Sequence, residues 1–250
     1  MQLQLIRNAT MRLEYGGHVM VLDPDFAPQH SRPSFTGKSP NPLVGLPVEV
    51  SEIINGVEAV IVSHLHRDHF DETAQHALPK DLPFFCQPGD ESTIQSKGFS
   101  RCSPVNDEIA WQGISMTRTE GHHGVGEVLN LMGEVSGFVF RAQGEQTIYW
   151  TGDTVWYEAV QNVVNAKQPD IIITHSSGAM WDDFPDSIVM DAAQTIAVCR
   201  AVPNSTVIAV HMDSLDHGTV TRAALREQAN IAGISESHLL IPANGETLRF

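Results

Sequence analysis

The stretch "IVSHLHRDHF", residues 61–70, places three histidines and an aspartate within six positions, directly after an apolar run. His64 and His66 are two residues apart, so on an extended segment both side chains point the same way and reach one ion. Asp68 and His69 follow as the chain turns into a helix, and they face a second ion from the other side. Imidazole and carboxylate groups suit Zn, Mn or Fe. The pattern therefore predicts a metal site, and the alternative is a solvated polar loop.

Further apolar runs end in residues of the same kind. "IYWTGDT" contains Asp153, "DIIITH" ends at His175 and "STVIAVH" ends at His211. "TEGHHG" places His122 and His123 in a glycine-flanked loop after another run. Loops at one end of a sheet commonly carry the side chains of a site in α/β folds. One such histidine, His175 for example, is equally well explained as a core residue, but the whole set favours one site.

The order of the elements indicates the fold class. "VEAVIVS" is a nearly continuous β-branched run, typical of a buried strand, and the first twenty-odd residues predict short strands with a turn at Gly16-Gly17. Helices are expected at about 156–166, 187–201 and 220–232. Two strand-rich halves, each with its own helices and no polar linker, predict an α/β fold with one two-sheet domain, residues 1–250, sandwiched by helices.

The segment 24–47 is rich in Pro, Ser, Gly and Asn and shows no periodicity. A loop of that length inside a compact domain is unusual and often functional. A loose insertion explains the composition equally well, so the sequence leaves the role of this segment open.

Composition and charge limit the partners. Lys and Arg total 15 against 30 Asp and Glu, a formal charge of -15. This negative charge repels nucleic acid and anionic membranes. No stretch approaches the roughly 18 apolar residues of a membrane span, and the N-terminus lacks signal-peptide features. Cys86, Cys102 and Cys199 are odd in number and far apart, which suits a reducing compartment. We expect a cytoplasmic enzyme with a small-molecule substrate, and a homo-oligomer is compatible with this.

In order along the chain, these motifs resemble those of the metallo-β-lactamase superfamily. The matching positions are Asp23 in "LDPD", the H-x-H-x-D-H signature, "GHHG", Asp153 in "TGDT" and His211 in "AVHMD". "NPLVGLP" and "YWTGDTVWY" look like the branch related to L-ascorbate 6-phosphate lactonase. The resemblance covers nearly the whole chain. It implies a four-layer αββα sandwich of two mixed β-sheets flanked by helices.

The resemblance also implies two groups of metal ligands bridged by Asp153. The first group is His64, His66 and His123, and the second is Asp68, His69 and His211. Spacing alone does not choose between His122 and His123, because neighbours on an extended loop point to opposite sides. Relatives of this branch look like T-x-G-x-H-G, which selects His123. An aspartate at the bridging position, where antibiotic-hydrolysing class B enzymes have cysteine, argues against that activity.

Two bound cations lower the pKa of a bridging water, so hydroxide exists at neutral pH. Asp68 is expected to bind metal and orient the proton of the nucleophile. His175 is expected to bind substrate or stabilise its developing charge, and His217 is a weaker candidate for that role. Asp23 and Asp213 are expected behind the ligands, accepting N–H from their imidazoles, with turn and cap formation as the alternative.

The resulting expectation is a metal-dependent hydrolase that uses a metal-bridging hydroxide on a small lactone or phosphorylated metabolite. Its cofactors would be two divalent ions, Zn or Mn, with Fe as a further option. A phosphodiesterase that processes nucleic acid is the second candidate, which the charge of -15 disfavours. A metal-dependent binding protein without turnover is the third. Arg7 and Asn8, in the first loop, are weak candidates for contacts to an anionic group of the substrate.

Overall fold

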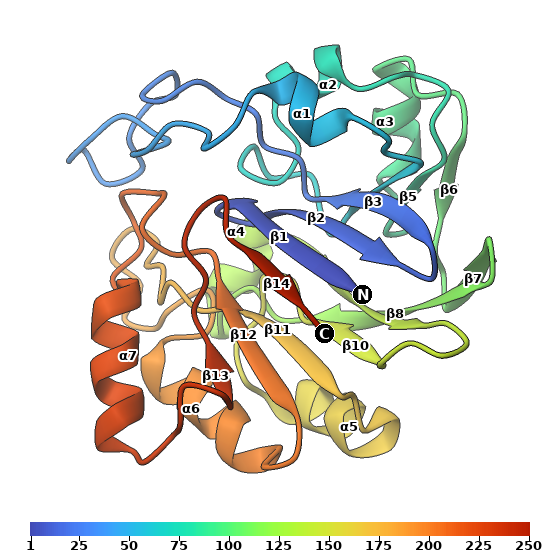
Figure 1. Ribbon diagram of the computed structural model, residues 1–250. Helices are drawn as coiled ribbons and strands as arrows, with labels where there is room; N and C mark the ends of the chain where they lie inside the picture. The colour runs from blue at the N-terminus through green and yellow to red at the C-terminus, as the bar shows by residue number, and fades with distance from the viewer.

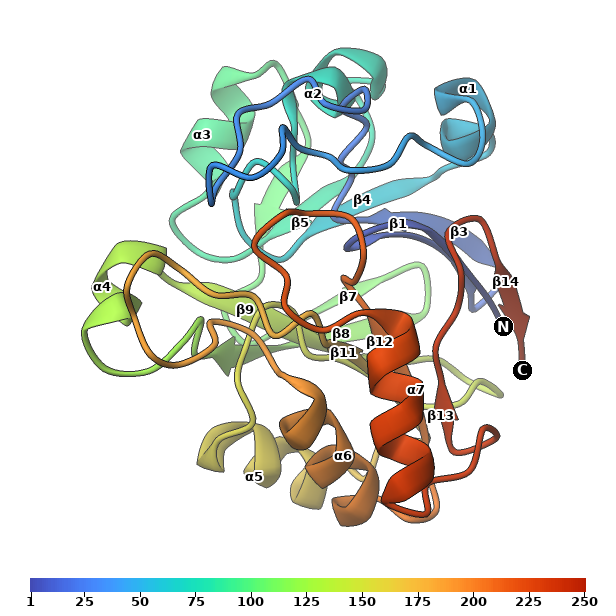
Figure 2. The same ribbon diagram turned by 90° about the vertical axis from the view of Figure 1, so that its left-hand side faces the viewer.

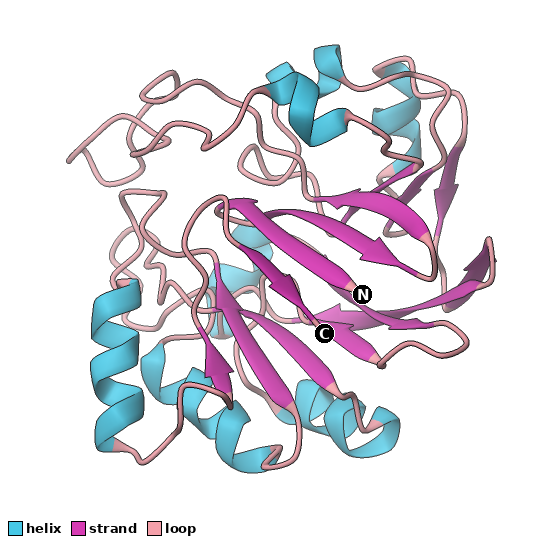
Figure 3. Cartoon of the chain, in the orientation of Figure 1, coloured by secondary structure: helices cyan, strands magenta, loops and turns pink.

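The computed structural model describes residues 1–250 and contains two seven-stranded mixed β-sheets (Figures 1 and 3). In the first sheet the strand order is β14-β1-β2-β3-β4-β5-β6. Strands β14 to β3 pair antiparallel, and β3 to β6 pair parallel. The strands are β1 (Gln2–Arg7), β2 (Thr10–Tyr15), β3 (His18–Leu22), β4 (Ala59–Val62), β5 (Phe84–Cys86), β6 (Cys102–Pro104) and β14 (Thr247–Arg249).

The second sheet has the order β13-β12-β11-β10-β9-β8-β7 and is built the same way. Strands β7 to β10 pair antiparallel, and β10 to β13 pair parallel. Its strands are β7 (Glu108–Trp111), β8 (Ile114–Gly121), β9 (Val135–Arg141), β10 (Ile148–Trp150), β11 (Ile171–His175), β12 (Thr206–Val210) and β13 (Leu239–Leu240).

Helices cover the outer face of each sheet, so the molecule has four layers (Figure 2). The helices on the first sheet are α1 (Val50–Ile54), α2 (Glu72–Ala77) and α3 (Glu91–Ser96). Those on the second sheet are α5 (Glu158–Lys167), α6 (Ala192–Ala201) and α7 (Arg222–Ile231), and the short η1 (Gly126–Val128) and α4 (Leu129–Met132) lie between β8 and β9. This arrangement confirms the predicted αββα sandwich. Every helix is too short or too polar to span a membrane.

Strand β4 shows why the run before His64 is apolar throughout. All four of its residues are buried. Ala59 and Ile61 pack in the core between the two sheets, whereas Val60 and Val62 pack under the helices of the first sheet. Because side chains alternate along a strand and both faces of this one are covered, no polar residue is tolerated there.

The three helices expected at about 156–166, 187–201 and 220–232 all begin later than the sequence predicts, at Glu158, Ala192 and Arg222. Helix α6 starts after Asp191, whose carboxylate accepts a hydrogen bond from Gln194 N, and α7 starts after Thr221, whose hydroxyl accepts one from Ala224 N. Such side-chain acceptors satisfy backbone donors that a first helical turn leaves free. The apolar residues at 188–190 belong instead to a buried extended segment.

The segment 24–47 is held to the first sheet by a buried arginine. The Arg7 guanidinium donates to the carbonyl oxygens of Asp25 at 3.0 Å, Ala27 at 3.0 Å and Val44 at 3.1 Å. Arg7 is fully buried and does not reach an open surface. The guess that Arg7 contacts a substrate anion is therefore wrong, because its donors are used to anchor this segment.

Candidate metal centre

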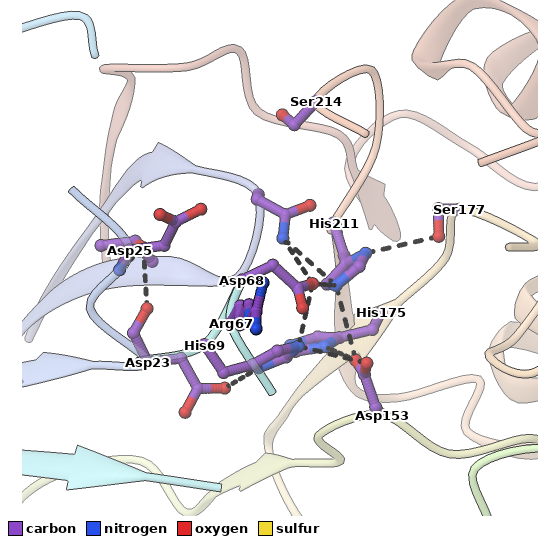
Figure 4. Close-up of polar contacts among 12 residues, drawn as sticks. Asp23, Asp25, Arg67, Asp68, His69, Asp153, His175, Ser177, His211 and Ser214 are labelled. Atoms are coloured by element: carbon purple, nitrogen blue, oxygen red, sulfur yellow. Dashed lines mark hydrogen bonds and ion pairs between the residues drawn. The ribbon is translucent and has the colours of Figure 1, made fainter. Parts of the chain in front are cut away.

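The candidate ligands lie where strands end, at one edge of the sandwich. His64 to His69 follow β4, His123 follows β8, Asp153 follows β10 and His211 follows β12. Although these residues lie far apart in the sequence, the strand ends of the two sheets bring them together. Figure 4 shows Asp68, His69, Asp153 and His211 meeting there.

The first group is His64, His66 and His123, whose ligand atoms lie within 4.8 Å of one another. His64 Nδ1 lies 2.9 Å from Ser63 Oγ, and its Nε2 is buried without a partner. His123 Nδ1 donates to the carbonyl oxygen of Ile188 at 2.7 Å, which leaves Nε2 free to face the group. An orphaned imidazole nitrogen among other imidazoles is satisfied by a metal ion, so the donor set fits one.

The second group surrounds His69 and His211. Asp68 Oδ2 lies 3.4 Å from His69 Nε2 and 3.3 Å from His211 Nε2. Asp153 Oδ2 lies 3.2 Å from His69 Nε2 and 3.4 Å from His123 Nε2. Asp153 therefore stands between the two groups, as a bridging carboxylate must.

Asp23 lies directly behind His69. Its Oδ2 is 2.6 Å from His69 Nδ1, and it also accepts hydrogen bonds from Ser63 Oγ and Ser63 N, both at 2.7 Å. This contact keeps a proton on Nδ1 and directs Nε2 toward the metal groups. The structure thus places Asp23 in the supporting position expected of it.

His175 lies behind Asp153 and not beside a substrate. Its Nδ1 is 2.5 Å from Asp153 Oδ1, and its Nε2 accepts a hydrogen bond from Trp150 Nε1 at 3.0 Å. Along β11, Ile171, Ile173 and His175 share the face that points between the sheets. Burial lowers the pKa of His175, so the ring is neutral at neutral pH. The expectation of substrate contact is therefore corrected: both ring nitrogens are occupied, and His175 orients Asp153.

Asp213 also departs from its expected role. It is exposed, and its Oδ2 accepts hydrogen bonds from Arg222 N at 3.2 Å and Arg222 Nη1 at 3.1 Å. Met212 is buried, so the next side chain along this turn points away from the core. Asp213 touches no ligand imidazole and instead fixes the start of α7.

Two other residues support His211 in its place. Ser177 Oγ lies 3.3 Å from His211 Nδ1, while Asn8 Nδ2 lies 3.3 Å from His211 Nε2 and donates to Asp68 Oδ2 at 3.2 Å (Figure 4). Asn8 occupies the turn between β1 and β2 with φ 55°, a conformation that asparagine tolerates. The sequence signals only a turn there, and the contact to Asp68 depends on the fold.

The neighbours His122 and His123 point to opposite sides. His123 is buried in the first group, whereas His122 is exposed and stacks on Tyr157 with ring centroids 3.9 Å apart. Gly124 follows with φ 107°, and a Cβ there would lie 2.4 Å from Val128 Cγ1. Only glycine lets the chain turn so sharply beside His123.

The electrostatics favour ionised carboxylates and mostly neutral imidazoles. Burial alone would raise the pKa of Asp153, but attraction to His69 and His211 outweighs it and holds that pKa well below its usual range. Burial lowers the pKa of His123 to about 4. Burial likewise acts to lower the pKa of His69, but the nearby carboxylates of Asp153 and Asp68 raise it well above normal. Metal binding at His69 Nε2 therefore requires the loss of a proton.

A cavity of about 330 Å³ opens above the two groups. Its polar floor is formed by His66, Asp68, His123, Asp153 and His211. Its wall is formed largely by Phe35, Leu65, Leu131, Met132, Ala179, Trp181, Ile188 and Val189. Arg67 is the single Lys or Arg side chain that borders it. The cavity thus combines metal-ligand chemistry with an apolar lining.

Known proteins are similar to this chain in sequence and fold. Residues 32–212 match the Beta-lactamase superfamily domain. The UPF0173 protein YddR of Bacillus subtilis (strain 168) is 36% identical, over all of both chains. Two solved structures align with this chain over nearly the whole length of both proteins. One, a possible metal-dependent hydrolase from Veillonella parvula DSM 2008, is 34% identical with a TM-score of 0.95 and coverage of 99% of this chain and 98% of its own.

The other solved structure, an isothiocyanate hydrolase from Delia radicum gut bacteria, is 38% identical with a TM-score of 0.93. It covers 100% of this chain, and 99% of its own length is matched. None of these three relatives is described as an L-ascorbate 6-phosphate lactonase. The narrower resemblance to that branch stays a prediction.

Proposed function

Because this chain belongs to the β-lactamase superfamily, in its UPF0173 family of metal-dependent hydrolases, we propose that it hydrolyses small, uncharged, apolar electrophiles of the isothiocyanate class. The observation that carries this proposal is the cavity, in which an apolar wall stands over a floor of metal-ligand side chains. The isothiocyanate hydrolase that is 38% identical supports the choice of substrate class.

The proposal includes two divalent ions, Zn or Mn, with Fe as a further option, because imidazole and carboxylate ligands suit these metals. His64, His66 and His123 would hold one ion. Asp68, His69 and His211 would hold the other, with Asp153 between the two sets. When bound, two such ions lower the pKa of water so that hydroxide forms near neutral pH.

The reaction needs a nucleophile and a path for the two protons of one water. The water oxygen would bond to the central carbon of R–N=C=S, the C=N electron pair would move to nitrogen, and nitrogen would take the first proton, which that water had given to Asp68. The hydroxyl proton then passes to nitrogen as the C–N bond breaks, which releases the amine R–NH2 and carbonyl sulfide and consumes one water overall. Asp68, on the cavity floor and held by Asn8, accepts and returns that proton.

The wall favours an apolar substituent R. Phe35 and Trp181 pack with ring centroids 5.8 Å apart, beside the half-exposed mouth of the cavity. Burial of apolar surface contributes about 25 cal/mol per Å². A small lactone is the second candidate substrate, because it too is an uncharged electrophile. A phosphorylated metabolite or a phosphodiester is less well supported, because Arg67 is the single Lys or Arg in the lining and the net charge is -15.

A substrate panel tests the proposal. The protein is stripped with a chelator, reloaded with Zn or Mn, and given 2-phenylethyl isothiocyanate, a homoserine lactone and bis(4-nitrophenyl) phosphate in parallel. We expect metal-dependent loss of the isothiocyanate with matching release of amine, and no amine from the Asp153→Ala variant. Turnover of the lactone or the phosphodiester alone would contradict the substrate class. Tight metal binding without turnover of any compound would favour the binding-protein alternative.

A cytoplasmic site of action is part of the same proposal. Cys86, Cys102 and Cys199 are all unpaired, and Cys86 and Cys199 are buried. Free thiols persist in a reducing compartment. Fractionation of the native host, with the protein detected by antibody, tests this location.

A further inference from the structure

His217 lies in the cavity wall without a partner for its imidazole. The residue is 8% exposed and borders the same cavity as Asp68 and His211. Its Nδ1 is buried with no hydrogen-bond partner, and no side-chain hydrogen bond of either ring nitrogen is present. A buried polar group that lacks a partner costs free energy, so native proteins rarely leave one without reason.

The metal-ligand histidines are held differently. Nδ1 of His64 is set by Ser63, that of His69 by Asp23 and that of His123 by Ile188, and such partners direct the other nitrogen to a metal. His217 has no orienting partner of this kind and belongs to neither metal group. Nδ1 is enclosed by protein, whereas Nε2 is neither hydrogen-bonded nor enclosed, so Nε2 is the ring nitrogen available to a molecule in the cavity.

Contacts from two other segments hold the His217 ring in place. Its ring meets that of Phe35 edge to face, with centroids 4.7 Å apart, and its carbonyl oxygen accepts a hydrogen bond from Met180 N at 3.0 Å. The preceding residue, Asp216, accepts hydrogen bonds from Phe35 N at 3.1 Å, Thr36 Oγ1 at 2.7 Å and Asn41 Nδ2 at 2.7 Å. The loop 33–41 is thus tied to the turn that carries His217.

We propose that His217 is a catalytic residue, which donates an N–H hydrogen bond to the substrate heteroatom that gains negative charge as hydroxide attacks the neighbouring carbon. For an isothiocyanate this atom is the nitrogen or the sulfur, an assignment that rests on the proposed function. The ring suits this task because it is a donor held in a largely apolar cavity wall before the reaction begins. Burial lowers the pKa of His217, so the ring is a neutral imidazole with one N–H at neutral pH.

Two substitutions separate catalysis from structure. His217→Leu removes the donor, and we expect full metal content, an unchanged melting temperature and a fall in kcat of about 10²- to 10³-fold, the usual effect of losing one such donor. His217→Gln keeps an N–H donor and is expected to recover part of that loss. His122→Leu, a change in an exposed histidine outside the cavity, serves as the matched control. Equal kcat in the wild type and His217→Leu would overturn the proposal.

A binding measurement tests His217 even if isothiocyanates are not the substrate. Thiocyanate, a linear anion with the same N–C–S skeleton, is titrated into the cobalt-loaded wild type and into cobalt-loaded His217→Leu, and the cobalt absorbance reports binding. We expect thiocyanate to bind the wild type about 10-fold more tightly, the contribution of one hydrogen bond. Equal affinities would refute the role of His217. A tenfold difference without isothiocyanate turnover would leave His217 supported and refute the substrate class.

Discussion

The loops that carry the metal ligands and the loops that wall the cavity are built in different ways. His64, Asp153 and His211 directly follow buried strands, and each is almost fully buried among polar partners. Phe35, Leu131 and Trp181 lie outside the sheets on loops or a short helix and keep part of their surface exposed. The sheets set the positions of the metal-ligand side chains, whereas contacts between loops set the positions of the wall residues.

This difference has a functional consequence. A ligand held by a strand end and a hydrogen-bonded partner keeps its geometry without substrate, which a hydrolytic metal site requires. A wall of loops can differ between relatives without disturbing the sheets. We therefore expect changes in the ligand loops to alter metal content, and changes in the apolar side chains of the wall to alter substrate preference and not metal content.

The largest effect is expected for Asp153→Ala. Because Asp153 faces both metal groups, we expect loss of at least one ion and a fall in turnover larger than the roughly 100-fold upper effect of losing a supporting residue. Elemental analysis measures the metal content, and the amine assay measures the turnover. Asp183→Ala, a change in an exposed aspartate, is the control. Two ions per chain together with wild-type turnover would show that Asp153 does not bridge.

Next comes the pair of adjacent histidines. His123→Ala is expected to lose metal from the first group and most activity, because its Nε2 lies 3.4 Å from Asp153 Oδ2. His122→Ala is expected to keep its metal and its activity, because His122 stacks on Tyr157 at the surface. Elemental analysis of the two purified variants decides between them. Metal depletion in His122→Ala would place the ligand one residue earlier.

His175→Ala is expected to weaken metal binding as well as turnover, since Asp153 loses the imidazole that holds its Oδ1. Losing such a support typically costs about 10- to 100-fold in metal affinity. Competition with a chromophoric chelator measures that affinity. An unchanged affinity combined with a lower kcat would return His175 to direct substrate contact.

A similar loss of metal affinity, about 10- to 100-fold, is expected for Asp23→Asn, because the amide no longer attracts the N–H of His69 as strongly. Asp213→Asn makes the same chemical change at the start of α7, where no ligand imidazole is touched. We expect it to bind metal like the wild type. Equal affinities in the two variants would remove the support that we assign to Asp23.

The smallest effect is expected in the wall, for Phe35→Ala. We expect KM for 2-phenylethyl isothiocyanate to rise about 5-fold, the result of losing roughly 40 Å² of apolar contact at 25 cal/mol per Å². Metal content and the KM for methyl isothiocyanate should not change. Phe250→Ala is a matched control, since Phe250 is 41% exposed against 42% for Phe35 and does not border the cavity. Equal changes for both substrates would argue against a role in selectivity.

Much of the metal centre is visible in the sequence because it depends on local pattern. Nearly continuous apolar runs mark β4 and β12 as buried strands, and a ligand-type residue after each strand marks the edge at which the site forms. The helices near 158 and 222 follow from the same reasoning, although each starts about two residues later than expected and the start of α7 is set by its capping residue Thr221. Local pattern, however, does not say which strand face meets the other sheet.

The direction in which a side chain points explains the corrections to His175 and Asp213. His175 was expected at the substrate, but β11 turns it between the sheets toward Trp150. Asp213 was expected behind a ligand, but its turn points it to Arg222 at the surface. In both cases the residue type and position were informative, and the direction of the side chain was set by packing.

The sequence by itself determined the ligand types, their order and the strands that carry them, because these depend on residues close together in the chain. The supporting contacts were decided only by the tertiary structure. Asn8 reaches Asp68 across 60 positions, and Ser34 to Asn41 meet Asp216 across about 180. Hydrogen bonds between segments so far apart exist only when both sheets have packed, since no local propensity encodes the partner of a distant donor.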